Sequence, residues 1–239
     1  ASCLVGSEMC IRDRNTILEV STTVGGKDYF NTIANLLCTH FGIKYAFIGE
    51  FFSDKNIVET ISFSKNGVIM DDFSYSLEHT PCQNVYENGL CIYLENVQEL
   101  FPKDVDLVKL NVNSYIGIPL IKDGVPIGLI VLMDSKPIDD SDKKISILNA
   151  IASKSVTEIE QIQYIREVRA YERYFSVSTD LMCITNAEGN FLQVNPRFSE
   201  TLGYNESELL NKSLADLVHP EDLDKMLKEI NGLSSNKIS

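Results

Sequence analysis

The chain has 239 residues, of which 44% are hydrophobic and 23% charged, values typical of a globular protein with a sizeable core. Its formal net charge of −13 argues against a nucleic-acid-binding surface, and no Lys/Arg cluster indicates a membrane-surface patch. The longest apolar run, 125–133, is shorter than the roughly 18 residues that a membrane span needs. Six scattered cysteines without a repeated spacing indicate a reducing, cytoplasmic compartment.

The first residues differ in character from the rest. Residues 1–14 begin without Met and lack the charged and apolar regions of a signal peptide, so we interpret them as a non-native leader without function. From 15 to 40 apolar residues recur at helical spacing, and "VGGKD" at 24–28 divides them into two helices. Asp28 is expected to cap the second helix, and Gly42 to end it.

The next segment alternates between strands and short helices. Two aromatic and β-branched runs, 45–52 and 57–64, flank a polar turn and predict a hairpin. The elements expected after it are a strand at 73–77, a helix at 80–89 with Thr80 as its cap and Pro81 at its first position, a strand at 90–94, and a helix at 102–111 with Pro102 at its start.

The strongest local pattern is "SYIGIPLIKDGVPIGLIVLMD", residues 114–134. Asp123 and Gly124 form a turn pair, since a two-residue hairpin turn needs positive φ at both central positions. Both flanking runs are apolar at successive positions, whereas a strand with one solvent face would alternate. The segment is therefore expected to form a hairpin in the middle of a sheet that is covered on both faces.

Residues 143–172 contain neither Gly nor Pro and predict one long helix. Its apolar and small residues at 3–4 spacing form a short seam: Ile145, Leu148, Ala152, Ser155, Ile159 and Ile162. Both a coiled coil with a second copy and packing against the helix's own domain fit this seam. We expect the front half to pack on its own domain, and the back half to link domains or to pair.

After this helix the pattern of strands and helices restarts. Residues 181–195 predict two strands around an Asn-Ala-Glu-Gly turn, and Asn195 is expected to cap a helix that Gly203 ends. The segment "NESELL" has the spacing of a capping box, and 219–230 predict a further helix that begins at a proline.

These motifs resemble two families. Through "YAFIGE", "TPCQNVYENG", "VQELFP" and the 114–134 hairpin, residues 15–165 resemble a GAF domain, whose last helix would continue to 172 as a linker. Through "DLMCITNAEGNFLQVNPRFSETLGY", "SELL" and "LVHPED", residues 173–239 resemble the first part of a PAS domain, which normally adds three further strands. The resemblance implies an α+β fold: a GAF-like antiparallel sheet flanked by helices, a long connecting helix, and a truncated PAS-like α+β domain.

One short stretch, "EHTPCQNVYENGLC", brings His79, Cys82 and Cys91 close in sequence. Their spacing differs from the paired cysteines of zinc sites, and their context differs from the bilin-binding pair of phytochromes, so neither ligand is expected. A position near a helix N-terminus would lower the pKa of Cys82, as a nucleophilic thiol requires. This resembles the free methionine sulfoxide reductases, but 107–117 lacks the cysteine essential to that family, whose members also stand alone without a PAS domain.

We expect the thiols of Cys82 and Cys91 to be small buried apolar groups. Cys82, Tyr115 and Met133 should belong to the core. The alternative is that they line a ligand pocket. The signatures of cyclic-nucleotide binding, flavin photosensing, histidine phosphorylation, phosphate loops and nucleotide cyclases are absent from the sequence. We therefore expect no catalytic residue, no cofactor, no metal and no enzymatic activity within this chain.

The layout predicts a role in signal transduction. The resemblance implies a cytoplasmic sensory input module of a bacterial two-component histidine kinase, or of a diguanylate cyclase or phosphodiesterase. The expected partners are an unidentified small-molecule ligand, a second copy bound through the 143–172 helix, and a downstream signalling domain, with no nucleic acid. Two alternatives remain open: a thiol-dependent free methionine sulfoxide reductase, and a dimerisation module without ligand.

Overall fold

The computed structural model describes residues 24–139, 141–225 and 228. The chain divides into two compact units, Ala1–Gln163 and Tyr164–Ser239, each with a sheet of its own. The boundary falls inside one long helix, α6 (Ser141–Val177). The leader expected at 1–14 and the first expected helix lie outside the described residues. Within the described part, no helix combines the length and the apolar character needed to cross a membrane.

The first unit is built on an antiparallel sheet. Within the described residues it has seven strands in the order β3-β2-β1-β7-β6-β5, and β4 pairs with β2 beside this row. The strands are β1 (Tyr45–Phe52), β2 (Ile57–Lys65), β3 (Val68–Met70), β4 (Ser74–Ser76), β5 (Cys91–Tyr93), β6 (Ser114–Lys122) and β7 (Val125–Asp134). The two predicted hairpins, β1-β2 and β6-β7, adjoin at the centre because β1 pairs with β7.

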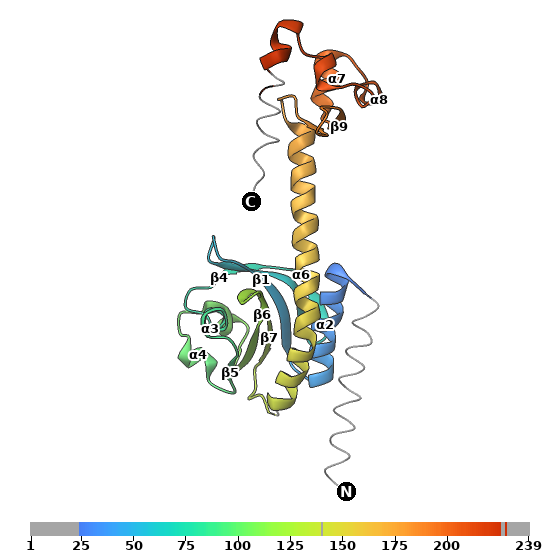
Figure 1. The fold of residues 1–239 in the computed structure, drawn as a ribbon. Helices are drawn as coiled ribbons and strands as arrows, with labels where there is room; N and C mark the ends of the chain where they lie inside the picture. The colour runs from blue at the N-terminus through green and yellow to red at the C-terminus, as the bar shows by residue number, and fades with distance from the viewer. Residues whose placement is uncertain (1–23, 140, 226–227, 229–239) are drawn as a thin grey trace. The chain divides into compact units, whose positions relative to one another are not determined.

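Helices cover both faces of this sheet, with α2 and α6 on the opposite side from α3 and α4 (Figure 1). On one face, α2 (Gly26–Phe41) and the front half of α6 share an apolar core with the strands. On the other face, a second core includes residues of α3 (Pro81–Asn88), α4 (Val97–Leu100) and α5 (Val105–Lys109). The sheet is therefore the middle of three layers and separates two apolar cores.

The central hairpin confirms the sequence prediction. Asp123 and Gly124 have φ angles of 49° and 82°, the left-handed geometry that the turn requires. Along β7, Ile130 and Leu132 belong to the core under α2 and α6, whereas Val131 belongs to the core on the other face. Because successive residues of a strand point to opposite faces, an apolar residue is needed at every one of these positions.

The front half of α6 packs on the first unit, as expected for this part of the predicted 143–172 helix. Leu148 and Ile159 are fully buried in the core that α2 shares. Ser155 is buried as well, and its Oγ lies 3.0 Å from the hydroxyl oxygen of Tyr29 on α2. The seam predicted from residue spacing therefore faces the helix's own domain, and its polar member finds a hydrogen-bonding partner there.

One predicted helix starts later than expected. The helix expected at 102–111 begins only at Val105, because the side chain of Asp104 initiates it. Asp104 Oδ1 accepts the backbone N–H groups of Asp106 at 3.1 Å and Leu107 at 3.3 Å. An aspartate cap satisfies the free N–H groups of the first turn, which the proline at 102 cannot do.

Two further details of the first unit differ from the sequence prediction. α2 begins at Gly26, so Asp28 lies inside its first turn instead of capping it, whereas Gly42 ends this helix with φ 61° as predicted. The sequence pattern does not predict β3, which pairs with β2 after the turn at 65–67. Its three residues are all exposed, so β3 lacks the buried face that periodicity detects.

The second unit combines the end of α6 with a small sheet. Its elements are β8 (Cys183–Thr185), β9 (Phe191–Val194), α7 (Pro196–Leu202), α8 (Glu206–Leu209) and the 3-10 turn η1 (Leu214–Asp216). Gly203 ends α7 with φ 77°, and Asn205 and Glu208 form the predicted capping box. Residues 220–225 are helical as the sequence predicts. A small core holds these elements together and contains Phe191, Val194, Phe198 and Leu209.

Asn195 has a different role from the predicted helix cap. It directly precedes α7, but its side chain makes no capping hydrogen bond. Instead, Oδ1 accepts the Met182 N–H at 3.1 Å, and Nδ2 donates to the Asp180 carbonyl at 2.9 Å. This fully buried amide therefore ties the segment before β8 to the end of β9.

Candidate ligand-binding pocket

A cavity of about 350 Å³ lies on the face of the sheet that α3 and α5 cover. Its walls come from β1, β4, β6 and β7 and from the first turns of α3 and α5. The apolar part of the wall includes Phe47, Phe73, Pro81, Leu107, Leu110 and Met133. The polar part includes Tyr75, Thr80, Cys82, Tyr115 and several charged residues. A mostly apolar cavity with a few polar groups is typical of small-molecule sites.

The first turn of α3 places Cys82 in this wall. Thr80 precedes the helix in extended backbone, and its Oγ1 accepts the Gln83 N–H at 3.3 Å, while Pro81 takes the first helical position. Both features confirm the sequence prediction. The Thr80 hydroxyl also donates to the Leu77 carbonyl at 2.7 Å, which fixes the turn before the helix. Cys82, the second residue of α3, is consequently buried, with only 4% of its surface exposed.

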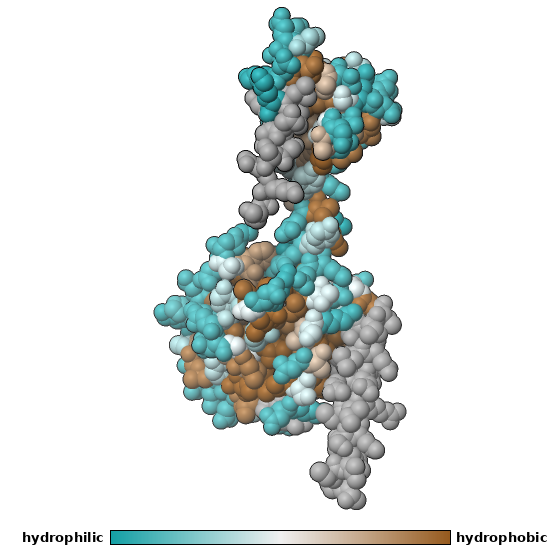
Figure 2. All heavy atoms as spheres, in the orientation of Figure 1, coloured by the Kyte–Doolittle hydropathy of each residue, from teal (hydrophilic) through white to brown (hydrophobic). Residues whose placement is uncertain are grey.

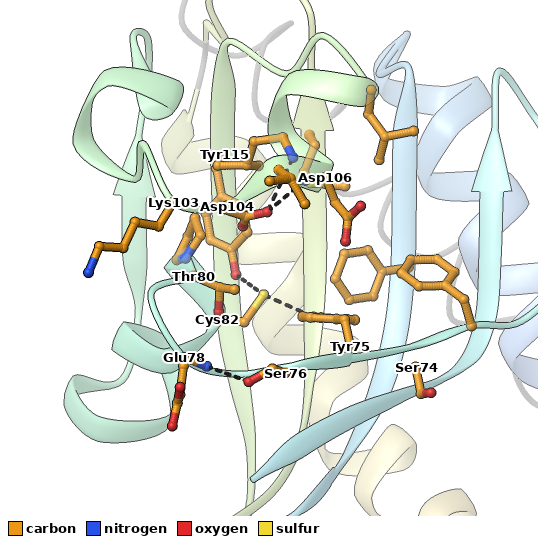
Figure 3. Close-up of a pocket in the computed structure, with 17 residues that line it drawn as sticks. Ser74, Tyr75, Ser76, Glu78, Thr80, Cys82, Lys103, Asp104, Asp106 and Tyr115 are labelled. Carbon is orange, nitrogen blue, oxygen red and sulfur yellow. Dashed lines mark hydrogen bonds between the residues drawn. The ribbon is translucent and has the colours of Figure 1, made fainter.

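Two tyrosine hydroxyls converge on the Cys82 sulfur (Figure 3). Tyr75 Oη donates to Sγ at 3.0 Å, and Tyr115 Oη lies 3.2 Å from the same atom. The ring of Tyr115 fits there because Gly117, two residues along β6, has no side chain. A Cβ at Gly117 would lie 2.7 Å from Cε1 of Tyr115. The result is a largely buried Tyr-Cys-Tyr chain whose central group, a thiol, is a weak hydrogen-bonding partner.

Burial controls the ionisation of this chain. Loss of hydration raises the pKa of Cys82 to about 11, although hydrogen bonds from Tyr115 and Tyr75 act in the opposite direction. Burial likewise raises the pKa of both tyrosines well above its ordinary value. The reductase alternative requires the helix N-terminus to lower the pKa of Cys82, and burial raises this pKa instead. At neutral pH this sulfur is a protonated thiol, which is a poor nucleophile.

Carboxylates supply most of the charge in the wall. Asp104, Asp106 and Glu78 all line the cavity. Burial, with a smaller contribution from Asp106, raises the pKa of Asp104. Lys103 also contributes to the wall, but its Nζ lies 3.4 Å from His79 Nε2, and Figure 3 shows its side chain pointing away from Cys82 and Tyr75. The net charge of the wall is therefore negative.

Comparison with protein families assigns the first unit. The family model described as "GAF domain" matches residues 27–155, more than half of the chain. The chain belongs to the GAF domain family. A second model, described as "PAS fold", matches residues 169–237. Every residue that lines the cavity lies within the GAF match.

Among curated proteins, the chain is similar to hybrid signal transduction histidine kinase F of Dictyostelium discoideum. The two are 24% identical over 204 residues, which is 84% of this chain but 17% of that kinase. The chain thus spans less than a fifth of the relative's length. The matched part of the chain is thus similar to part of a signalling protein.

Solved structures share the fold of the GAF domain. The GAF domain of an Acinetobacter phosphoenolpyruvate-protein phosphotransferase has a TM-score of 0.53 at 15% identity and covers 66% of this chain and 98% of its own. Free methionine-R-sulfoxide reductase from Neisseria meningitidis gives 0.54 at 14% identity, covering 65% and 90%. The chromophore-binding domain of an R. palustris bacteriophytochrome gives 0.53 at 14%, covering 65% and 62%. At these identities the likeness concerns the fold alone.

The GAF domain brings the three predicted pocket residues together. Cys82, Tyr115 and Met133 all line the same cavity, and Tyr115 and Met133 are cross-strand partners on β6 and β7. His79 and Cys91 do not line it, although both come from the same short stretch as Cys82. In the described part of the chain, no three His, Cys, Asp or Glu side chains gather as a metal site would require.

Sequence reasoning does not single out several residues that complete the wall: Phe47, Phe73, Tyr75, Asp104 and Asp106. One signal for them is present in "FSYSL", because the alternation of Phe73 and Tyr75 puts both rings on one face of an extended segment. The two aspartates carry no comparable signal, since acidic residues near the start of a helix are ordinary features of that position.

Proposed function

We propose that this chain is the sensory input part of a signalling protein, such as a histidine kinase, in which the GAF cavity binds a small ligand and α6 relays its occupancy. The observation that carries the proposal is the cavity of about 350 Å³ inside the GAF domain, to whose wall the strand β7 contributes Met133. The chain passes from the end of β7 to the start of α6 within a few residues. A displacement of this strand is therefore transmitted to the helix through a short connection.

The alternation of side chains along β7 supports a mechanical link between cavity and helix. Met133 lines the cavity, whereas its neighbour Leu132 belongs to the core under α6, together with Leu148 and Ile159 of the helix. Because packed cores are dense, a strand that shifts on one face must move its side chains on the other. A ligand biases the arrangement of α6 only if it binds one arrangement more tightly than the other.

Polar contacts hold α6 at defined points of the GAF domain. Glu158 Oε2 accepts the Gly26 N–H at the start of α2 at 2.6 Å, and Gln163 Nε2 donates to Glu50 Oε1 on β1 at 2.7 Å. Both glutamates are buried, so a change in the position of the helix would leave a buried charged group without these partners. Such contacts favour a defined position of the helix over a continuous drift.

The back half of α6 supports the second part of the proposal, a homodimer formed through this helix. Within the second unit several large side chains of α6 are exposed: Tyr164, Ile165, Tyr171, Tyr174 and Val177. Figure 2 shows apolar side chains among polar ones along this stretch of the helix. Burying them against the same helix of a second copy would remove their apolar surface from water. A downstream signalling domain would then receive a paired helix as its input.

The thiol-dependent reductase is a weaker candidate, because the protonated Cys82 thiol described above lacks the reactivity that this chemistry needs. The module without ligand makes a different prediction from ours. If a metabolite panel is screened with the full chain, a compound that binds only the native state must raise the melting temperature. We expect at least one such compound, with a matching change in amide exchange along α6. A panel without any hit would favour the ligand-free module.

The contact between β7 and α6 can be tested by one substitution. A Cβ at Gly128 would lie 2.5 Å from the Gly49 carbonyl oxygen and 2.9 Å from Ile159 Cδ1. Gly128→Ala should therefore destabilise the GAF domain by about 1–3 kcal/mol, as overpacked cores do. Amide exchange should become faster in the part of α6 around Ile159 and stay unchanged in β8 and β9. Unaltered exchange in α6 would contradict the link between this strand and the helix.

A further inference from the structure

We propose that the ligand of the GAF cavity is a small organic ammonium ion with an apolar body, whose charged nitrogen lies between the Asp104 carboxylate and the surrounding rings. This inference rests on the proposed function, namely that the cavity binds a ligand. It adds the chemical class of that ligand.

The wall offers the faces and edges of four aromatic rings: Phe47, Phe73, Tyr75 and Tyr115. Three of them form one cluster, with ring centroids 5.8 Å apart for Phe73–Tyr75, 6.2 Å for Phe47–Tyr75 and 6.4 Å for Phe47–Phe73. Aromatic faces carry a negative quadrupole that attracts cations, most strongly where water is excluded. The same rings provide the apolar surface that the body of the ligand would contact.

The carboxylates of the wall are incompletely neutralised by the protein. Among the described residues Asp104 forms no ion pair, and its Oδ2 accepts no hydrogen bond, because both backbone N–H groups bind Oδ1. Asp106 pairs with Lys109 at 2.8 Å, but the lysine is largely exposed, so water screens this pair. Lys103 contacts His79 instead of a carboxylate. A cation inside the cavity would supply the charge that the wall lacks.

The phenol oxygens supply a second, independent indication. Tyr115 is almost fully buried, yet among the described residues its hydroxyl has only the Cys82 sulfur as a hydrogen-bonding partner. Tyr75 also donates to this sulfur. Each phenol oxygen keeps acceptor capacity that a thiol cannot use well, because a thiol is a weak donor. The N–H groups of an ammonium ion are strong donors that would satisfy these oxygens.

An anionic ligand fits the same wall poorly. Its charge would lie near Asp104, Asp106 and Glu78, and like charges brought together in a partly buried site repel strongly. The lysine of the wall, Lys103, points away from Tyr75 in Figure 3. The balance of charge therefore favours a cation over a neutral molecule, and a neutral molecule over an anion.

The test uses the full chain and three probes that share a phenyl ring and have similar lengths: 2-phenylethylammonium, 2-phenylethanol and 3-phenylpropionate. Calorimetric titration and melting temperature are measured with each probe at neutral pH. We expect the ammonium probe to bind most tightly and to raise the melting temperature, and the carboxylate probe to do neither.

Asp104→Asn is the decisive variant, because asparagine keeps the capping oxygen of α5 but removes the charge. It should weaken ammonium binding about tenfold to a hundredfold, the usual cost of a hydrogen bond to a charged group. Glu99→Gln removes one charge from an exposed position of α4 outside the cavity wall, and it should leave binding unchanged.

Each other outcome overturns the inference. If 2-phenylethanol or 3-phenylpropionate binds as tightly as the ammonium probe, the cavity is a ligand site but does not select cations. If Asp104→Asn binds the ammonium probe as well as the wild type does, the carboxylate has no part in recognition. If none of the three probes binds, the ammonium assignment fails, and the metabolite panel then decides separately whether the cavity binds any ligand.

Discussion

The pH dependence of the free energy of unfolding tests whether burial raises the pKa of Cys82. Burial raises the pKa of this thiol from 9.0 to about 11 in the folded chain. Because the folded value is the higher one, its contribution to stability is fully present below pH about 9 and is lost as the pH rises through about 11. The complete loss corresponds to about 3 kcal/mol, and about 2 kcal/mol of it should be lost by pH about 10.5.

The assay compares the wild type with Cys82→Ser, whose hydroxyl does not titrate in this range but can still bond with Tyr75 and Tyr115. Urea unfolding is followed by far-UV circular dichroism, since the chain contains no Trp and tyrosine fluorescence changes with ionisation. Other groups titrate in both proteins, so the difference between the two pH profiles isolates Cys82. The free energy of unfolding of the wild type should fall by about 2 kcal/mol more than that of the variant between pH about 7.5 and about 10.5.

Parallel profiles would refute this reasoning, because they would mean that the Cys82 thiol ionises in the folded chain as readily as in the unfolded one. Site-resolved alkylation provides a second measurement on the same sample. At neutral pH iodoacetamide should modify the half-buried Cys183 before Cys82, since reaction requires both access and the thiolate. Faster modification of Cys82 would restore the thiol-dependent reductase as a candidate.

Two further substitutions test the packing around the cavity and in the second unit. Gly117→Ala should push the Tyr115 ring away from Cys82 and cost about 1–3 kcal/mol in the free energy of unfolding, as measured in urea; an unchanged value would mean that the strand absorbs the methyl group. Asn195→Ala removes the two hydrogen bonds of a buried amide and should destabilise the second unit by about 2–4 kcal/mol. Amide exchange in β8 and β9 measures this loss with the GAF domain as an internal reference, and unchanged protection there would contradict the role assigned to this side chain.

The features that sequence reasoning predicts well are those that a few neighbouring residues determine. Asp123 and Gly124 form the hairpin turn, Thr80 and Pro81 begin α3, and Gly42 ends α2, all as expected. Each depends on a local need, either a positive φ or a free backbone N–H group. The family resemblance adds the GAF assignment, and the match of residues 27–155 to the GAF domain model bears it out.

The features that sequence reasoning misses depend on contacts between distant residues. Asn195 stands where a helix cap is expected, but its amide bonds with Met182 and Asp180 because β8 lies beside β9. The sequence does not show that Gly117 must be a glycine. That requirement comes from the Tyr115 ring, which occupies the space that a side chain at this position would need. Asp104 caps α5 and lines the cavity at once, and only the first of these roles has a local pattern.

The same limit applies to the cavity itself, where one irregularity in the sheet decides which residue faces it. Near the turn β6 and β7 pair in register, with Lys122 opposite Val125 and Ile121 opposite Pro126. A shift at Leu120 moves the remaining pairs by one residue. Without that shift, Tyr115 would pair with Leu132 instead of Met133.

A shift by one residue exchanges the two faces of a strand, and bulges are the usual means of producing it. Because Leu132 and Met133 are both apolar, the hydrophobic pattern alone is compatible with either register. The observed register gives Met133 to the cavity and Leu132 to the core under α6. The apolar run at 125–133 gives β7 an apolar side chain for each face of the sheet, as a link between a ligand site and a signalling helix requires. The same run leaves the register of the strand undetermined from the sequence.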